Sequence, residues 1–266
     1  WSFQNYIMLK SSRKKLIAIG CSFTRYRGTF TRHMDDFPEW PTHLAQELDM
    51  ECVNLGWGGV GNEYISAKLI DTILSEKKKD IGLVVLMWSG WQRMDFEDIN
   101  NNWYRIRPSP DNRQNIKNPV AFLNIQNPET IIMLNTIMLK YNNAHNATMK
   151  SLRHFLIAQR LLEDIPYLMM QGIEPIHRTE FLEEKSKDIW LQSFLNSKIF
   201  DEIDEKKFIG WPIMQEIGGY TVGDILNKID PEQKELRISA EDRHPNDEGH
   251  KIMAQEIYNA YEKNYL

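Results

Sequence analysis

The chain has 266 residues, of which 42% are hydrophobic and 26% are charged, and this composition is typical of a folded protein large enough for one α/β domain. The 32 Lys and Arg residues are outnumbered by 37 Asp and Glu residues, and the net charge of −5 argues against a nucleic-acid or anionic-membrane partner. The 2 cysteines cannot form a disulfide framework and lack the spacing of a zinc site, so we expect neither a metal nor another cofactor.

The N-terminal segment lacks the basic-then-apolar order of a signal peptide. No apolar stretch approaches the ~18–20 residues that a membrane-spanning helix needs. We therefore expect a soluble, cytoplasmic protein. The chain begins with Trp1 rather than Met, and the sequence leaves open both whether residues precede it and its oligomeric state.

Strand and helix patterns alternate through the first third of the chain. An apolar run that stops at Gly20 indicates a buried parallel strand. Pro41 suits the first turn of a helix, and Asn62 suits the N-cap of the next one. Three strand–helix steps imply a parallel sheet with helices on both faces. The expected elements are strands over 16–19, 51–56 and 81–90 and helices over 37–50 and 62–79.

The regular pattern lapses between Asp95 and Thr130, a segment rich in Asn, Pro and Asp. We expect an irregular insertion here, near the carboxyl edge of the sheet. Regular patterns then return, and the whole chain, 1–266, is interpreted as one α/β domain with a central parallel sheet of about five strands. The later elements are a long helix over 131–164, a strand over 166–172, a helical stretch over 185–203 and a C-terminal amphipathic helix over 246–266.

The stretch "GWGGVG", Gly56 to Gly61, satisfies the G-x-G-x-x-G pattern of a dinucleotide phosphate loop. It follows the second expected strand rather than the first, however. The acidic residue that would hold a ribose hydroxyl is also absent from the end of the next strand, which reads Trp88-Ser89. Dinucleotide binding is therefore a minor alternative.

Two nucleophile-type residues, Cys21 and Ser22, directly follow the first strand. A serine hydroxyl attacks only when a histidine takes its proton and an acid orients that histidine. The segment "EDRHPNDEGH", 241–250, offers His244 with carboxylates two and three residues before it, whereas His250 is expected to cap or pack. Cys21 would need exposure beside a base, and we expect it to point into the packing beneath the turn.

Three stretches together resemble the blocks of the SGNH (GDSL-type) hydrolase family. They are "GCSFT", "NLGWGGVGN" and "DRHPNDEGH", in the family's order and across most of the chain. The resemblance implies a flavodoxin-like three-layer fold that hydrolyses or transfers acyl esters without a metal. It places the nucleophile on Ser22, the general base on His244, and the oxyanion-binding backbone N–H groups on Ser22 and Gly59.

The sequence departs from the family at three points. Cys21 stands where the first block usually has Asp. The family's acid is usually three residues before the histidine, where Glu241 lies; we expect Asp242, two before, with Glu241 left open. The asparagine of the third block, an oxyanion donor, has no counterpart in "WSGWQRM", and we expect Ser89 to replace it, with Arg93 as the alternative and Gln92 also within this segment.

We therefore expect a serine esterase that acts on a small acyl group, such as an acetyl ester on a carbohydrate. The carbohydrate rests on the family's frequent substrates and on tryptophans in expected loops, which are Trp57, Trp88, Trp91, Trp103 and Trp211. The alternative is a catalytically degenerate SGNH fold that serves as a binding or structural module. Similar sequences with these blocks also occur in bacteriophages, so a phage origin is open.

Overall fold

The computed structural model contains a five-stranded, fully parallel sheet in the order β2-β1-β3-β7-β8. Numbered within the sheet, this order is 2-1-3-4-5, that of flavodoxin-like folds, and it confirms the expected fold class. The strands are β1 (Lys15–Gly20), β2 (Glu51–Asn54), β3 (Ile81–Trp88), β7 (Tyr167–Gln171) and β8 (Phe208–Ile209). The structure describes residues 13–26, 37–108, 120–123, 129, 133, 143–175 and 184–266.

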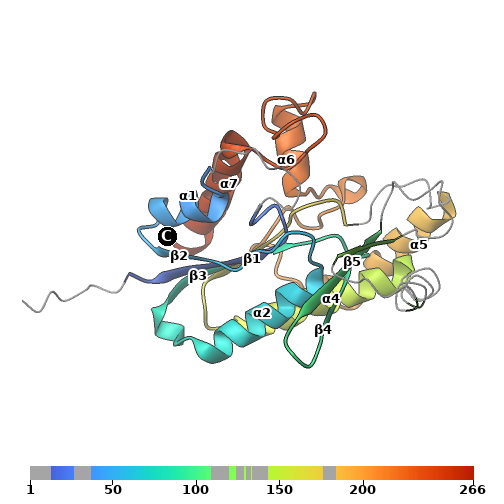
Figure 1. Cartoon of the computed structure of the whole chain (residues 1–266), viewed down its shortest axis with the longest axis horizontal. Coiled ribbons are helices and arrows are strands. Elements are labelled where there is room, and N and C mark those ends of the chain that lie inside the picture. Colours follow the sequence, from blue (N-terminus) through green and yellow to red (C-terminus); the bar gives the residue numbers. More distant parts are fainter. Residues whose placement is uncertain are drawn as a thin grey trace, which may run out of the picture.

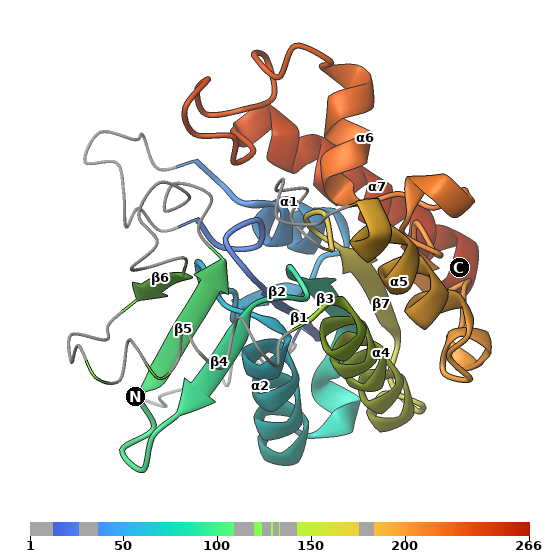
Figure 2. The same ribbon diagram turned by 90° about the vertical axis from the view of Figure 1, so that its right-hand side faces the viewer.

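Helices cover both faces of this sheet, as Figures 1 and 2 show. Side chains alternate along β1, so Ile17 and Ile19 enter one apolar cluster while Leu16 and Ala18 enter the other. The first cluster includes residues of α2 (Asn62–Ser75), α4 (Ala144–Leu161) and α5 (Glu184–Leu195). The second includes residues of α1 (Trp40–Glu47), α6 (Val222–Ile229) and α7 (Asp247–Tyr265). Short 3₁₀ turns lie at Lys78–Asp80, Phe200–Glu202 and Gln215–Ile217.

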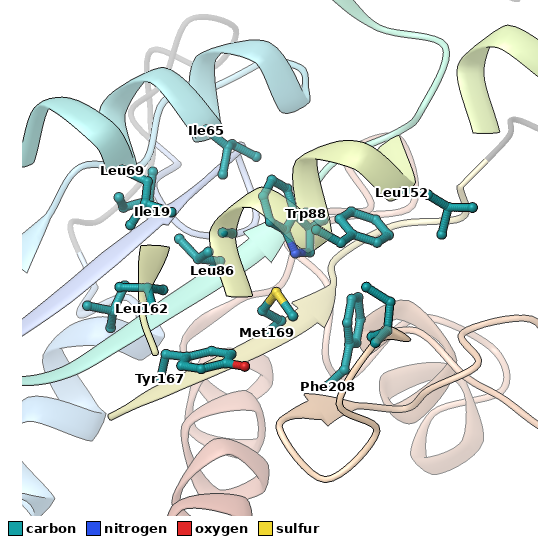
Figure 3. Packing of buried hydrophobic residues seen from close by; sticks show 14 of the residues in the cluster. Ile19, Ile65, Leu69, Leu86, Trp88, Leu152, Leu162, Tyr167, Met169 and Phe208 are labelled. Carbon is teal, nitrogen blue, oxygen red and sulfur yellow. The ribbon is translucent and has the colours of Figure 1, made fainter. Parts of the chain in front are cut away.

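The larger cluster has an aromatic centre, seen in Figure 3. The Trp88 ring at the end of β3 lies 4.9 Å from the Phe155 ring of α4, centroid to centroid. Phe155 in turn lies 5.2 Å from Phe208 of β8. All eight residues of β3 are buried, so this central strand is a rigid support for what lies at its carboxyl end.

The segment expected to be irregular, 95–130, forms strands where it is described, which corrects that expectation. β4 (Met94–Glu97), β5 (Trp103–Pro108) and β6 (Val120–Leu123) form a separate three-stranded antiparallel sheet, which lies beside α2 in Figure 2. The strands are short and a polar turn separates the first two, so their alternation is too brief to stand out in the sequence. Residues 109–119, 124–128 and 130 lie outside the described part.

Three element boundaries also differ from expectation. Gly61 rather than Asn62 is the N-cap of α2, because the buried Asn62 side chain instead accepts a hydrogen bond from the Ser89 N–H at 2.9 Å. The helix expected over 131–164 is described at residue 133 and as α4, which Asn143 caps through the Asn146 N–H and which ends at Leu161. Residues 131–132 and 134–142 are outside the described part. α5 ends at Leu195 and continues as turns. Within the described residues, no helix is both long and apolar enough to cross a membrane.

Candidate active site

Four segments converge at the carboxyl edge of the parallel sheet, where α/β folds place their sites. The turn after β1 carries Ser22, the glycine loop 56–61 follows β2, Ser89 follows β3, and the loop before α7 carries His244. These segments lie up to 222 residues apart in the chain, the separation between Ser22 and His244.

The turn at Ser22 is fixed by its own backbone and by Gly20. The N–H groups of Thr24 and Arg25 both donate to the Cys21 carbonyl, at 2.9 and 3.1 Å. A Cβ atom on Gly20 would lie 2.2 Å from Thr24 Oγ1 and 2.8 Å from the Met87 carbonyl oxygen, so only glycine fits here. Cys21 is fully buried in the core, in the orientation expected of it.

The histidine loop is held by backbone pairing on both sides of His244. The Ile238 N–H donates to the His244 carbonyl at 2.9 Å, and Arg237 and Pro245 form an antiparallel bridge. Asn246 caps α7 by accepting from the Gly249 N–H at 3.0 Å. The imidazole therefore projects from a short loop pinned directly before a helix.

His244 connects Ser22 with Asp242. Its Nε2 lies 2.8 Å from Ser22 Oγ, the hydrogen-bond distance expected from the sequence. Its Nδ1 lies 2.5 Å from Asp242 Oδ1. Because a carboxylate only accepts, Nδ1 carries the proton and Nε2 is left to accept from the Ser22 hydroxyl. This is the tautomer that a general base needs.

Asp242 rather than Glu241 is the acid that the structure brings to His244. The exposed Glu241 carboxylate instead accepts from the Ser239 hydroxyl at 3.0 Å. Partial burial raises the pKa of Asp242, but hydrogen bonds from the Tyr26 hydroxyl and from His244 outweigh it and leave that pKa below its ordinary value. Asp242 is consequently an anion at neutral pH.

His250, the other histidine of this segment, packs in the interior as expected. It is fully buried, and its Nδ1 accepts from the Trp40 N–H at 3.3 Å. Burial lowers the pKa of His250 to about 3, so the ring is neutral.

The glycine loop closes the other side of Ser22. A Cβ atom on Gly58 would lie 3.9 Å from the Ser22 Cβ, so the loop passes directly beside the serine. Gly59 has φ +81°, a left-handed conformation that favours glycine. Within the described residues, no hydrogen bond engages the backbone N–H of Ser22 or that of Gly59, which leaves both able to bind an oxyanion.

Two residues of the antiparallel sheet anchor this loop. Arg105 of β5 donates from Nη1 to the Gly58 carbonyl, and its guanidinium lies 4.0 Å from the Trp57 ring centroid. Asp95 of β4 accepts from the N–H groups of Gly61 and Tyr64, at 2.7 and 3.1 Å. A dinucleotide pyrophosphate would need these same N–H groups at the helix N-terminus, so the Asp95 carboxylate argues against the phosphate-loop interpretation.

Ser89 and Arg93 also hold the glycine loop. The Ser89 hydroxyl donates to the Val60 carbonyl at 2.8 Å, and Arg93 Nη1 donates to both the Val60 carbonyl and Ser89 Oγ, at 2.9 and 2.8 Å. Both side chains are buried. A hydroxyl has one proton to donate, so this geometry gives Ser89 a structural contact, and its expected role as third oxyanion donor stays a prediction.

The tryptophans divide into two groups. Trp88 and Trp91 are fully buried core residues, so they cannot line a substrate groove. Trp57, Trp103 and Trp211 are half-buried against the core. Across the described ranges, no group of three or more His, Cys, Asp and Glu side chains could hold a metal ion.

Two residues beside the site, Tyr26 and Glu39, were not expected from the sequence. Tyr26 donates to Asp242, and its ring lies 4.7 Å from the His244 ring. Glu39 accepts from the Tyr26 N–H and from Asn54 Nδ2, the latter at 2.9 Å, while Asn54 Oδ1 accepts from the Gly56 N–H at 3.0 Å. The close spacing of Tyr26 to Ser22 was the one available signal; nothing in the sequence marks Glu39.

No family model matches the chain, and no curated protein matches it. Solved structures similar to it include a member of the lipolytic protein G-D-S-L family from Veillonella parvula, with 12% identity, a TM-score of 0.47, and coverage of 94% of this chain and 99% of that one. A putative lipolytic protein of the same family from Desulfitobacterium hafniense has 15% identity, a TM-score of 0.44 and coverage of 93% and 99%. The acetylxylan esterase Axe2 from Geobacillus stearothermophilus has 14% identity, a TM-score of 0.45 and coverage of 93% and 93%.

Proposed function

We propose that this protein is a serine hydrolase that cleaves small acyl esters. The observation that carries the proposal is the continuous hydrogen-bond chain from Ser22 through His244 to Asp242, with 2.8 Å and 2.5 Å links. Its elements are a nucleophile, a base in the required tautomer, and an ionised acid that orients the base.

In this mechanism, His244 Nε2 takes the hydroxyl proton as Ser22 Oγ attacks the ester carbonyl. The resulting imidazolium is stabilised by Asp242, and it then protonates the departing alcohol to leave an acyl-serine. Water, deprotonated by the same imidazole, attacks the acyl-serine and releases the acid, which regenerates the free hydroxyl.

The tetrahedral intermediates carry negative charge on the former carbonyl oxygen. Two hydrogen-bond donors are proposed to stabilise that charge. They are the backbone N–H of Ser22 itself and that of Gly59 in the neighbouring glycine loop. The loss of one such donor typically costs about 10²–10³ in rate, so a hole of two donors would give a slower enzyme than one of three.

The acyl group is proposed to be small, with acetyl as the first choice, and the alcohol to be a carbohydrate hydroxyl. The sugar rests on the sequence resemblance and on the half-buried Trp57 within the glycine loop. A panel of p-nitrophenyl esters from acetyl to octanoyl, together with acetylated xylan, tests both parts.

The decisive experiment combines turnover with covalent labelling. The wild-type protein should hydrolyse p-nitrophenyl acetate, and a fluorophosphonate should add to Ser22, as located by mass spectrometry. Ser22→Ala should lose both reactions while it keeps the wild-type thermal transition, and Cys21→Ala should keep most of the activity. Labelling at Cys21, or wild-type turnover in Ser22→Ala, would contradict the proposal.

The second candidate function is a non-catalytic binding module. It is favoured by one observation: the third-block side chains Ser89 and Arg93 both donate to the Val60 carbonyl, so these two candidate oxyanion donors are already engaged. Absence of turnover across the ester panel, together with a Ser22 that resists fluorophosphonate, would support this function instead.

A further inference from the structure

Asp242 has a second partner besides His244. Its Oδ1 faces the imidazole, and its Oδ2 accepts a hydrogen bond from the Tyr26 hydroxyl. Oδ1 also accepts from the His244 backbone N–H at 3.1 Å, so His244 engages one carboxylate oxygen and Tyr26 the other. Since His244 and Tyr26 both lie in segments that form the site, the plane of the Asp242 carboxylate is also fixed.

Tyr26 is itself held in place from several directions. It follows the tight turn that presents Ser22, and its backbone N–H donates to Glu39. Glu39 binds Asn54, which in turn binds the glycine loop at Gly56. The phenol therefore links the acid of the candidate triad to the turn and the loop that carry the other reacting groups.

The Tyr26 ring also contacts the base. Its centroid lies 4.7 Å from that of His244 with the planes at 47°, and Phe23 lies 5.5 Å from the same imidazole at 53°. Two aromatic neighbours from one turn restrict rotation of the imidazole, but only Tyr26 also reaches the carboxylate.

We propose that Tyr26 is a positioning residue that completes a Ser22–His244–Asp242–Tyr26 tetrad and sets the basicity of His244 by sharing the charge of Asp242. This inference rests on the proposed function for its catalytic consequence. Its structural basis, the phenol–carboxylate–imidazole chain, is independent of any substrate.

The direction of the effect follows from the charge on Asp242. The phenol draws negative charge toward Oδ2 and lessens the attraction that Oδ1 exerts on a protonated His244. Without the hydroxyl, the carboxylate stabilises the imidazolium more strongly, so His244 should hold its proton to higher pH. The Asp242 orientation would loosen at the same time.

The test is Tyr26→Phe, which removes one oxygen and keeps the ring. We expect kcat for p-nitrophenyl acetate to fall on the order of ten-fold, within the range for a hydrogen bond to a charged group, with KM nearly unchanged. The acid limb of the kcat/KM profile should move up by about half a pH unit. A purely structural role for the phenol would lower the folded fraction without moving this limb.

A second readout does not need turnover. The His244 ring is followed by NMR over pH 4–9 in protein with ¹⁵N-labelled histidine, and His244→Gln assigns its signal. We expect the titration midpoint to rise in Tyr26→Phe. The segments that meet here also carry other titratable groups, which are the same in both proteins: Arg25, Glu39, His43, Glu241, Arg243, Asp247 and His250.

Tyr104→Phe is the matched control, because Tyr104 also donates to a carboxylate, Asp98 Oδ2 at 3.2 Å, but in the exposed β4–β5 turn. It should leave both the His244 titration and kcat unchanged. In an Asp242→Asn background, Tyr26→Phe should add little further loss, since the shared carboxylate is gone.

An unchanged or lowered His244 midpoint in Tyr26→Phe would overturn the proposal, as would additive losses in the double variant when the enzyme is active. If the wild type proves inactive on every ester but the midpoint still rises, the proposed function fails while the charge sharing by Tyr26 stands.

Discussion

The two sides of Ser22 are built in different ways. On the acid–base side, side chains near the start and end of the chain meet directly, through the Ser22–His244 and His244–Asp242 hydrogen bonds. On the proposed oxyanion side, the candidate donors are backbone N–H groups, and side chains from later segments hold the backbone in place. The geometry of the acid–base side depends on the identity of its own side chains. The geometry of the oxyanion side depends on the side chains that pack around the glycine loop.

The glycine loop illustrates the second kind of construction. In the Val60–Gly61 peptide, the carbonyl accepts from Ser89 and Arg93 while the N–H donates to Asp95. In the Gly58–Gly59 peptide, the carbonyl accepts from Arg105. Two of these four anchors, Arg93 and Arg105, are charged and buried, so they fix the loop through strong, desolvated hydrogen bonds. Fixing peptides in this way prepares donors before the substrate arrives.

The sharpest test of the acid–base side compares neighbouring carboxylates. Asp242→Ala should lower kcat by about 10³–10⁴, because the imidazole loses both its tautomer and its orientation. Glu241→Ala is the matched control and should change kcat less than two-fold, since the exposed Glu241 carboxylate accepts from Ser239 rather than from His244. Steady-state kinetics on p-nitrophenyl acetate separates them. Similar losses in both variants would mean that the two acids exchange roles in solution.

The oxyanion side should respond strongly to Arg105. A peptide is planar and trans, so its carbonyl and N–H point in opposite directions. By binding the Gly58 carbonyl, Arg105 therefore fixes the direction of the Gly59 N–H. Arg105→Met should lower kcat by about 10², comparable to the loss of one oxyanion donor, with little change in KM.

Arg160→Met is the control for Arg105, because Arg160 forms an exposed ion pair with Glu202 and lies outside the site. It should leave kcat unchanged. If Arg105→Met retains wild-type kcat and stability, the antiparallel sheet does not support catalysis. The claim that side chains of this sheet hold the oxyanion side in place would then be wrong.

The same contrast explains how far the sequence alone could go. The parallel sheet, the turn at Ser22 and the His244 loop were predicted because local signals mark them: an apolar run ended by glycine, and a His-Pro-Asn segment before a helix. The antiparallel sheet was missed, since its short strands carry little periodicity. The anchoring roles of Arg105 and Asp95 could not be predicted, because they depend on where that sheet packs.

Ser89 offers a smaller test within the oxyanion side. If its hydroxyl were the third oxyanion donor, Ser89→Ala would cost about 10²–10³ in kcat. The hydroxyl donates to Val60 instead, so we expect a loss in kcat below ten-fold and a decrease of about 0.5–1.5 kcal/mol in the free energy of unfolding, because the buried Val60 carbonyl loses one donor and keeps Arg93. Urea denaturation and kinetics on the same samples distinguish the two roles. A rate loss of 10² or more at unchanged stability would restore Ser89 as a donor.

The smallest effect concerns His250, which is buried in the first turn of α7, shortly after the His244 loop. Burial lowers the pKa of His250 to about 3, whereas an unfolded histidine titrates near 6.5. Between these pH values the unfolded state binds a proton that the folded state excludes. The stability contributed by the neutral ring is therefore complete above about pH 6.5 and is lost as pH falls toward 3, with a slope of up to about 1.4 kcal/mol per pH unit.

His250→Gln removes this titration, so the comparison is between slopes rather than absolute stabilities. Urea unfolding at pH 7.5, 6, 5 and 4.5 should show the wild type losing stability faster than His250→Gln below pH 6.5, with parallel curves above it. His145→Gln is the control, because His145 is exposed and bonded to Ser193, and it should follow the wild-type slope.

On the oxyanion side, burial and the nearby Glu63 charge raise the pKa of Asp95, so that residue favours folding at lower pH. Acidification should therefore destabilise the fold through His250 but not through Asp95, and equal slopes in all three proteins would contradict the expected contribution of His250.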